Sequence, residues 1–150
     1  MTRSVSRILV LFCPLLLLTA CNIRWVSEYD AQTDQAVTQL HRKTETFLTH
    51  LEQQQVPDCL SSKHQAFYQQ SLVDVRALKV RAQAISNNEI TLQQLSLLEE
   101  NLTLMQKIHK LQDTSDSCLA AGTIQFNRSN FESVFTAILK FELAKKRQVK

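Results

Sequence analysis

The sequence has very little glycine and proline. Its 150 residues include one glycine, Gly122, and two prolines, Pro14 and Pro57. The dipeptides Asn-Gly, Asp-Gly and Gly-Gly, which form tight β-hairpin turns, do not occur. A chain with one glycine also cannot contain the glycine-rich loops that bind phosphates. Gln, Leu, Ala, Lys and Glu are abundant instead, and these good helix formers predict an all-α fold.

The sequence also lacks the motifs of several classes of enzyme and metalloprotein. It contains no H-E-x-x-H, no G-x-S-x-G, no C-x-x-C-H and no Glu-x-x-His pair. Glu99 and Glu100 are adjacent on a predicted helix, so they do not face each other as a pair of catalytic carboxylates would. We therefore expect no enzyme activity, no catalytic residue, and no cofactor or metal.

A strong excess of charge is missing as well. The chain has 17 basic and 14 acidic residues, a formal net charge of +3, and no basic footprint of the kind that binds nucleic acid. Basic residues cluster only at the C-terminus, in the stretch KKRQVK. We expect no nucleic-acid partner.

The N-terminus carries an apolar run that is too short to cross a membrane. Residues 1–7 contain Arg3 and Arg7 and no acid, and residues 8–18 are continuously apolar. A membrane-spanning helix needs about 20 apolar residues, whereas a positive segment followed by a shorter apolar one is typical of a secretory signal peptide.

The end of this run resembles the lipobox of bacterial lipoprotein precursors, in the residues Leu18-Thr19-Ala20-Cys21. The resemblance implies transfer of diacylglycerol to the Cys21 thiol, cleavage before Cys21, and acylation of the new amine with a fatty acid such as palmitate. The alternative is an ordinary signal peptide with a cysteine near the cut by chance. By resemblance to the enterobacterial sorting rule, Asn22 implies a periplasm-facing lipoprotein of the outer membrane.

The count of cysteines fits export. Of the four cysteines, Cys13 leaves with the signal peptide and Cys21 takes the lipid. The remaining two, Cys59 and Cys118, are expected to form a disulfide in an oxidising compartment.

Four segments of the remaining chain show apolar residues at helical spacing. They cover about 33–51, 62–87, 91–112 and 118–146. Thr91 and Gln94 fit a capping box at the start of the third helix, with Ile90 and Leu95 as its hydrophobic staple. Short connections between helices predict an up-down-up-down four-helix bundle. We expect a signal peptide at 1–20, a lipidated tether at 21–27, the bundle at 28–146 and a basic tail at 147–150.

This topology brings Cys59 and Cys118 to the same end of the bundle, away from the membrane. His64 and His109 are expected at that end too, which raises the alternative of a Cys2His2 zinc site. The four residues lie one per element, without the paired spacing that strong zinc motifs have. We favour a disulfide with two histidines beside it.

The third helix has more apolar surface than a core-facing helix needs. One stripe consists of Leu95, Leu98, Leu102, Met105 and His109. A second consists of Leu97, Leu104, Ile108 and Leu111. Together they cover roughly 200° of the helix, whereas somewhat over 100° is usual. The second stripe either packs on a neighbouring helix or forms an exposed patch that a partner covers.

The same topology returns the last helix to the membrane-proximal end. Lys145, Lys146 and Arg147 then lie close to the lipidated cysteine. They either complement the dipole at the helix C-terminus or contact anionic lipid headgroups as well.

These expectations combine into a non-enzymatic lipoprotein that is held to the membrane by its N-terminal lipid. We expect it to act as an adaptor or assembly factor that binds another envelope protein. In size, anchor and disulfide it is similar to the small helical pilotins that escort secretins. The alternative is a periplasmic protein that handles a metal or cofactor through the histidines and cysteines of the distal end. The oligomeric state does not follow from the sequence.

Overall fold

The described part of the protein is all-helical. The computed structural model describes residues 26–113 and 117–148. It contains α2 (Ala31–Gln53), a short 3-10 helix η2 (Ser61–His64), α3 (Gln65–Gln83), α4 (Glu89–Asp113) and α5 (Ala121–Gln148). The predicted all-α fold is confirmed, and no strand occurs in these two ranges. The predicted signal peptide and Cys21 lie outside the described residues.

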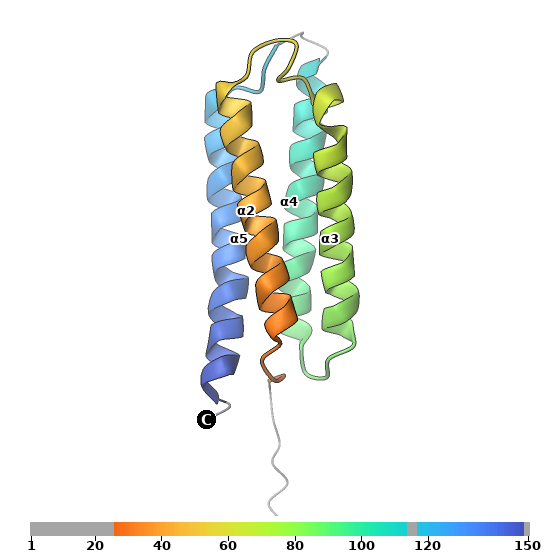
Figure 1. Ribbon diagram of the computed structural model, residues 1–150, viewed down its shortest axis with the longest axis vertical. Coiled ribbons are helices and arrows are strands. Elements are labelled where there is room, and N and C mark those ends of the chain that lie inside the picture. Colours follow the sequence, from red (N-terminus) through yellow and green to blue (C-terminus); the bar gives the residue numbers. More distant parts are fainter. Residues whose placement is uncertain (1–25, 114–116, 149–150) are drawn as a thin grey trace, which may run out of the picture.

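The four long helices form a bundle. Figure 1 shows them side by side, with α2 next to α5 and α3 next to α4. Helix α3 packs mainly on α4, and α5 packs on both α2 and α4, whereas α2 and α3 contact each other less. None of the described helices is long and apolar enough to cross a bilayer.

The two ends of the bundle are fastened by contacts between residues far apart in the chain. At one end, Cys59 and Cys118 form a disulfide. At the other, the Ser27 amide donates to the Asn87 carbonyl over 2.9 Å, and the Ser27 hydroxyl donates to the Asn88 side chain, also over 2.9 Å.

The core follows the predicted apolar spacing most closely in α2. All six predicted positions are buried, namely Thr33, Val37, Leu40, Thr44, Phe47 and Leu51. Their alternating spacing of four and three residues places them on one face of the helix, against its neighbours in the bundle. Asp30 caps this helix, because its carboxylate accepts hydrogen bonds from the amides of Gln32 and Thr33.

The second predicted helix is shorter than the sequence indicated. Residues 61–64 form a 3-10 turn before α3, and α3 ends at Gln83 rather than near residue 87. Asn87 has a φ of 59°, in the left-handed region that asparagine tolerates better than most residues. A residue in this conformation cannot continue a right-handed helix, so the chain turns here into α4.

The predicted capping box at Thr91 is wrong. Helix α4 begins at Glu89, and the Leu92 amide already donates to the Asn88 carbonyl over 3.1 Å. Thr91 is fully buried inside the first turn, and its hydroxyl donates to the Glu142 carboxylate over 2.8 Å. Ile90 is 47% exposed and therefore does not form the predicted staple with Leu95. The local sequence pattern assigned the Thr91 side chain to the helix cap, but this side chain instead forms a tertiary hydrogen bond with Glu142.

Three boundaries also differ from the prediction. Ser27 was assigned to the tether, but it is buried and fixed to the bundle by its two hydrogen bonds. Cys118 precedes the last helix by three residues, since α5 begins at Ala121. That helix continues to Gln148, so residues 147 and 148 of the predicted tail are helical.

Candidate functional site

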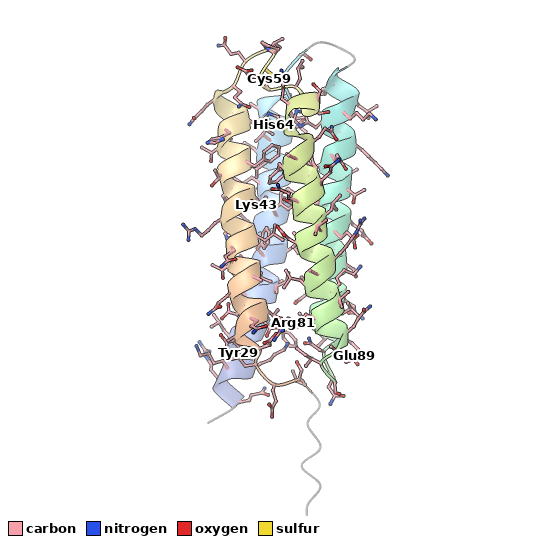
Figure 2. All side chains as sticks on the ribbon, turned by 45° about the vertical axis from the view of Figure 1, so that its right-hand side comes forward. Tyr29, Lys43, Cys59, His64, Arg81 and Glu89 are labelled. Carbon is pink, nitrogen blue, oxygen red and sulfur yellow. A yellow bond between two sulfur atoms is a disulfide. The ribbon has the colours of Figure 1, made fainter. Side chains whose placement is uncertain are left out.

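The disulfide confirms the predicted pairing of Cys59 with Cys118. The two Cα atoms are 5.4 Å apart, although the residues are separated by 59 positions in sequence. Cys59 is almost completely buried. Figure 2 shows Cys59 at the same end of the bundle as His64.

The histidines at this end take part in the packing of the bundle. The His109 Nε2 lies 2.7 Å from the Cys59 carbonyl oxygen, and its Nδ1 lies 2.8 Å from the Tyr68 hydroxyl. Because a carbonyl oxygen only accepts, the His109 Nε2 donates the hydrogen bond to Cys59. His64 Nε2 lies 2.9 Å from the Asp58 carbonyl oxygen.

This geometry does not fit the alternative zinc site. A Cys2His2 site needs two thiolates, and both sulfurs are consumed by the disulfide. Within residues 26–113 and 117–148, no group of three or more His, Cys, Asp or Glu side chains is arranged to hold a metal. The disulfide between Cys59 and Cys118 and the buried hydrogen bonds of His109 therefore hold this end of the bundle together.

The second apolar stripe of the third predicted helix is largely exposed. Leu97 is 51% exposed, Leu104 50% and Leu111 69%. Ile108, the fourth predicted member, is partly buried and packs against the core instead. Ile90 takes its place at the beginning of the helix, so the exposed residues recur at intervals of seven. We call Ile90, Leu97, Leu104 and Leu111 the α4 stripe.

The interval of seven keeps the stripe on one side of α4, because residues seven apart differ by only about 20° around a straight helix. In a left-handed supercoil, residues seven apart keep the same direction relative to neighbouring helices. The buried face of α4 follows the same rule, with Leu95, Leu98, Leu102, Met105 and His109 spaced by three and four. The first and last members of the α4 stripe are 21 positions apart, which corresponds to about 31 Å along the helix.

Other exposed apolar side chains are spread over the remaining helices. Val73 and Val80 on α3 are 63% and 67% exposed, and Phe126 and Leu143 lie exposed on α5. On α3 the two valines are followed by no third large apolar residue at the same interval. The α4 stripe is thus the longest regular series of exposed apolar side chains in the described residues.

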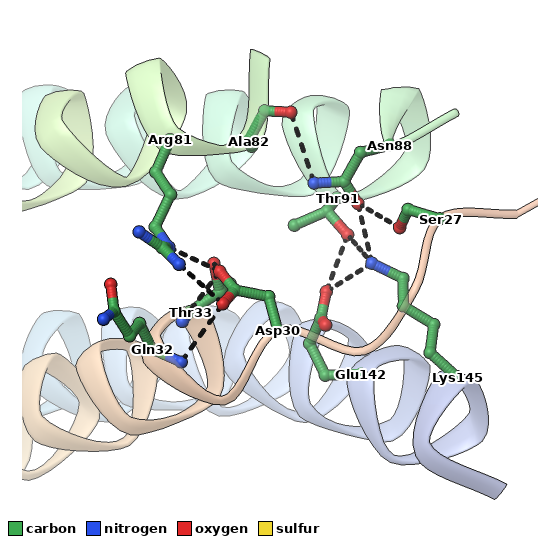
Figure 3. A network of polar contacts seen from close by, with 10 residues as sticks. All are labelled: Ser27, Asp30, Gln32, Thr33, Arg81, Ala82, Asn88, Thr91, Glu142 and Lys145. Atoms are coloured by element: carbon green, nitrogen blue, oxygen red, sulfur yellow. Dashed lines mark hydrogen bonds and ion pairs between the residues drawn. The ribbon is translucent and has the colours of Figure 1, made fainter. Parts of the chain in front are cut away.

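A buried polar cluster occupies the opposite end from the disulfide (Figure 3). The Lys145 ammonium donates to Asn88 Oδ1 over 2.6 Å, to Thr91 Oγ1 over 2.9 Å and to Glu142 Oε1 over 2.6 Å. The side chains of Lys145 and Glu142 are each only 1% exposed. Asn88 also donates to the Ala82 carbonyl over 3.3 Å and accepts from Ser27. The cluster joins the segment before α2, the turn between α3 and α4, and both of the last two helices.

This arrangement corrects the prediction for Lys145. The sequence placed Lys145, Lys146 and Arg147 together on a membrane-proximal basic surface. The structure turns Lys145 into the interior, where a buried carboxylate and two neutral oxygen atoms accept its three N–H bonds. Lys146 and Arg147 are exposed, and the Lys146 ammonium lies 5.1 Å from the centre of the Tyr29 ring.

A second ion pair fastens α2 to α3 near this end. Arg81 donates to both carboxylate oxygens of Asp30 through Nε and Nη2, with the Nη2 contact at 2.7 Å. These bonds, together with that from the Thr33 hydroxyl, hold the pKa of the Asp30 carboxyl well below its usual range. The carboxylate therefore caps α2 and binds α3 at once.

Two of these features were missed by sequence reasoning. Ile90 could have been assigned to the stripe by extending the interval of seven backwards from Leu97. Glu142 and Lys145 could have been read as an ion pair, because their spacing of three brings side chains together on a helix. Nothing in the sequence indicated that this pair is buried.

No protein-family model, curated protein or solved structure matches the chain. The functional argument therefore depends on the residues and contacts described above.

Proposed function

We propose that the protein is a lipoprotein of the outer membrane that faces the periplasm and binds another envelope protein. The lipobox residues 18–21 and the apolar run before them support the anchor on Cys21. In this proposal the protein has no enzymatic role and acts as an adaptor or assembly factor.

We include in the proposal the up-down-up-down topology of the bundle. Its support is the pairing of chain segments at the two ends: Cys59 with Cys118 at one end, and Ser27 with Asn88 and Lys145 at the other. A chain that crosses the bundle four times brings these segments together in this way. The anchored tether and the C-terminus of α5 then share the membrane-proximal end.

The buried polar cluster supports a structural rather than a catalytic role for its charged residues. An ammonium has three N–H bonds, and all three of Lys145 are accepted by side chains of the bundle. A catalytic lysine or carboxylate needs access to a substrate, whereas both members of this pair are shielded from solvent.

The α4 stripe is the observation on which the binding proposal depends. Its four large apolar side chains are about half-exposed or more at regular intervals along one helix, and we take this regular exposure as the mark of an interaction site. Burying half-exposed leucines against a partner is favourable by roughly 25 cal/mol for each Å² removed from water.

Site-specific photo-cross-linking in intact cells tests the proposal. A photoreactive residue at Leu104 should give discrete cross-links to protein, and the same residue at Val80 on α3 should not. Both positions are exposed and apolar, so they differ mainly in their helix. Equal labelling from the two positions, or none from Leu104, would refute a binding role for the α4 stripe.

A further inference from the structure

We infer that the chain bound along the α4 stripe is a second copy of this protein, with the two α4 helices packed side by side in parallel. This inference rests on the proposed function, because it takes the stripe to be a binding surface and the chain to be anchored at one end. It makes the envelope protein that occupies the stripe a second copy of the chain itself rather than a different protein, and it adds the direction of the bound helix.

The residues of α4 match a coiled-coil heptad at its d positions and at one of its a positions. If the α4 stripe supplies the d positions of a heptad, three of its four members are leucines. The a positions are then Gln94, Asn101 and Ile108. Of these only Ile108 is apolar, and isoleucine at a with leucine at d favours two-stranded coils. A polar asparagine at an a position, such as Asn101, fixes the register of the pair at a cost in stability.

The a positions are close enough to the surface to take part. Gln94, Asn101 and Ile108 are half-buried, between the exposed stripe and the core. Two parallel helices would place Asn101 opposite its own copy, where the two amide side chains can exchange hydrogen bonds. The same pairing places each leucine of the stripe opposite itself.

A constant interval of seven also favours a helix over other ligands. Side chains on one face of a strand repeat about every 6.7 Å, whereas the members of the α4 stripe repeat about every 10.5 Å, so the two spacings do not match. A second helix with the same interval stays in contact over the whole ridge of about 31 Å, because both helices supercoil to the same degree.

The anchor favours the parallel direction. Ser27 lies at the end of the bundle that also holds the buried polar cluster, and only residues 22–26 separate it from Cys21. These residues reach roughly 20 Å even when fully extended. Two upright copies on one membrane therefore have their α4 helices in the same direction. An antiparallel pair would put the two anchors at opposite ends of a 25-residue helix, about 37 Å apart.

The antiparallel pair has one feature in its favour. Glu100 and Lys107 flank the stripe on its exposed side, one heptad apart. Centred near Leu104, an antiparallel pair would bring Glu100 of each copy close to Lys107 of the other. Exposed ion pairs contribute only about 0.2–1 kcal/mol each, which is a weaker constraint than the short anchor.

The size of the stripe indicates that the dimer depends on the membrane. Stable interfaces commonly bury about 800 Å² on each partner, and a single ridge of four half-exposed side chains offers less. Anchoring both copies in one membrane raises their effective concentration without adding any contact. We therefore expect a dimer in membranes that dissociates readily in dilute detergent.

Disulfide trapping in membranes tests the direction and the identity together. The full-length lipidated protein is produced with Ile90→Cys, Leu97→Cys, Leu111→Cys or Val80→Cys, and membranes are treated with a mild oxidant. Each stripe variant should form a disulfide-linked homodimer, and Val80→Cys should remain monomeric. Peptide mapping verifies that Cys59 and Cys118 are still paired with each other.

A mixed experiment separates the two directions. When Leu97→Cys and Leu111→Cys carry different tags and are co-expressed, the parallel arrangement gives only the two homodimers. A dominant Leu97–Leu111 cross-link between the tags would overturn it in favour of the antiparallel pair. Homodimers that form equally well from Val80→Cys would overturn the interface itself.

Cysteine trapping and photo-cross-linking together distinguish a wrong partner from a wrong binding surface. If no homodimer forms but the photoreactive residue at Leu104 labels a different envelope protein, the second copy is wrong and the binding role stands. Leu104→Glu gives a further check in membranes: it should reduce trapping at position 97 at least tenfold, whereas Val80→Glu should not. Both positions are exposed, so circular dichroism should report a folded bundle for both variants.

Discussion

Lys145 and Glu142 form the most deeply buried ion pair among the described residues. Taking two charges out of water is costly, and their attraction offsets that cost only when further hydrogen bonds satisfy them. Here Asn88 and Thr91 supply those bonds to the ammonium. The Glu142 Oε2 atom has no hydrogen-bond partner, so the carboxylate is satisfied through one oxygen only.

We expect Lys145→Ala to destabilise the bundle by about 3–5 kcal/mol, because it leaves the Glu142 carboxylate buried without its cation. Urea unfolding followed by circular dichroism measures the effect. The paired change Lys145→Met with Glu142→Leu should recover much of the loss, since it removes both charges. Lys146→Ala, one residue further on and exposed, is the control and should change stability little.

The Asp30–Arg81 pair predicts a dependence of stability on pH. The hydrogen bonds from Arg81 and the bond from Thr33 lower the pKa of Asp30 in the folded protein. A carboxyl group with a lowered folded pKa contributes stability above its unfolded pKa, near 4, and loses it as the pH falls through the folded value. The contribution should therefore be complete at pH 7 and decline below about pH 4.

Asp30→Asn tests this dependence while keeping a residue that can cap α2. Arg81 is partly exposed and screened by solvent, so we expect a loss on the order of 1 kcal/mol at pH 7. The difference from the unmodified protein should shrink as the pH is lowered from 4 to 2. A difference that stays constant over this range would show that the carboxylate charge is not responsible.

At the scale of the elements, the sequence predicted the helices better than their ends. In α2, every predicted core position is buried, because the alternation of four and three residues follows directly from helix geometry. The start of α4 was misplaced, because Thr91 and Gln94 satisfy a local rule that the buried Glu142 overrides. Contacts between residues 51 positions apart leave no trace in local spacing.

The α4 stripe was predicted only in part, again because contacts between distant residues do not show in local spacing. Leu97, Leu104 and Leu111 were separated from the buried face of α4 by their angle on the helix, and they are exposed. Ile108 has a similar angle but packs against the core, since the neighbouring helices shield that side. Which side of an apolar arc is covered depends on how neighbouring helices pack, and a single sequence does not specify this.

The disulfide connects the segment after α2 to the segment before α5, so its loss should loosen one whole end of the bundle. Closing 59 residues of chain stabilises a fold by about 4 kcal/mol in the chain-entropy model. Replacing both cysteines by alanine should lower the melting temperature by roughly 10–20 °C. Adding a reductant should lower the melting temperature of the unmodified protein and leave that of the variant unchanged. An equal response of the two proteins would contradict the prediction.

For the whole molecule, the proposed anchor has a direct test. Cys21→Ser removes the thiol that would accept diacylglycerol, so the variant should not incorporate labelled palmitate and should retain residues 1–20. Cys13→Ser is the matched control, because it changes a cysteine of the same segment outside the lipobox. Normal labelling of the Cys21→Ser variant would show that the lipid is attached to a residue other than Cys21.

The exposed cations at the end of α5 give the last prediction, which concerns how the bundle lies on the membrane. With Lys145 buried, Lys146 and Arg147 remain as the basic residues of the predicted surface among those described. Each basic residue close to an anionic surface contributes about 1 kcal/mol, and the attraction fades within a Debye length of about 8–10 Å. Because the proposed lipid would hold the protein by itself, these residues should set its orientation rather than its retention.

We therefore expect Lys146→Gln with Arg147→Gln to leave membrane retention unchanged and to alter orientation. A spin label at Leu143, which is exposed on α5, reports the depth of this end in vesicles. In the unmodified protein the label should lie closer to bilayers containing phosphatidylglycerol than to neutral ones, and added salt should remove the difference. In the double variant the two bilayers should give the same depth at every salt concentration. If the unmodified protein already shows no difference at low salt, Lys146 and Arg147 only complement the dipole of α5.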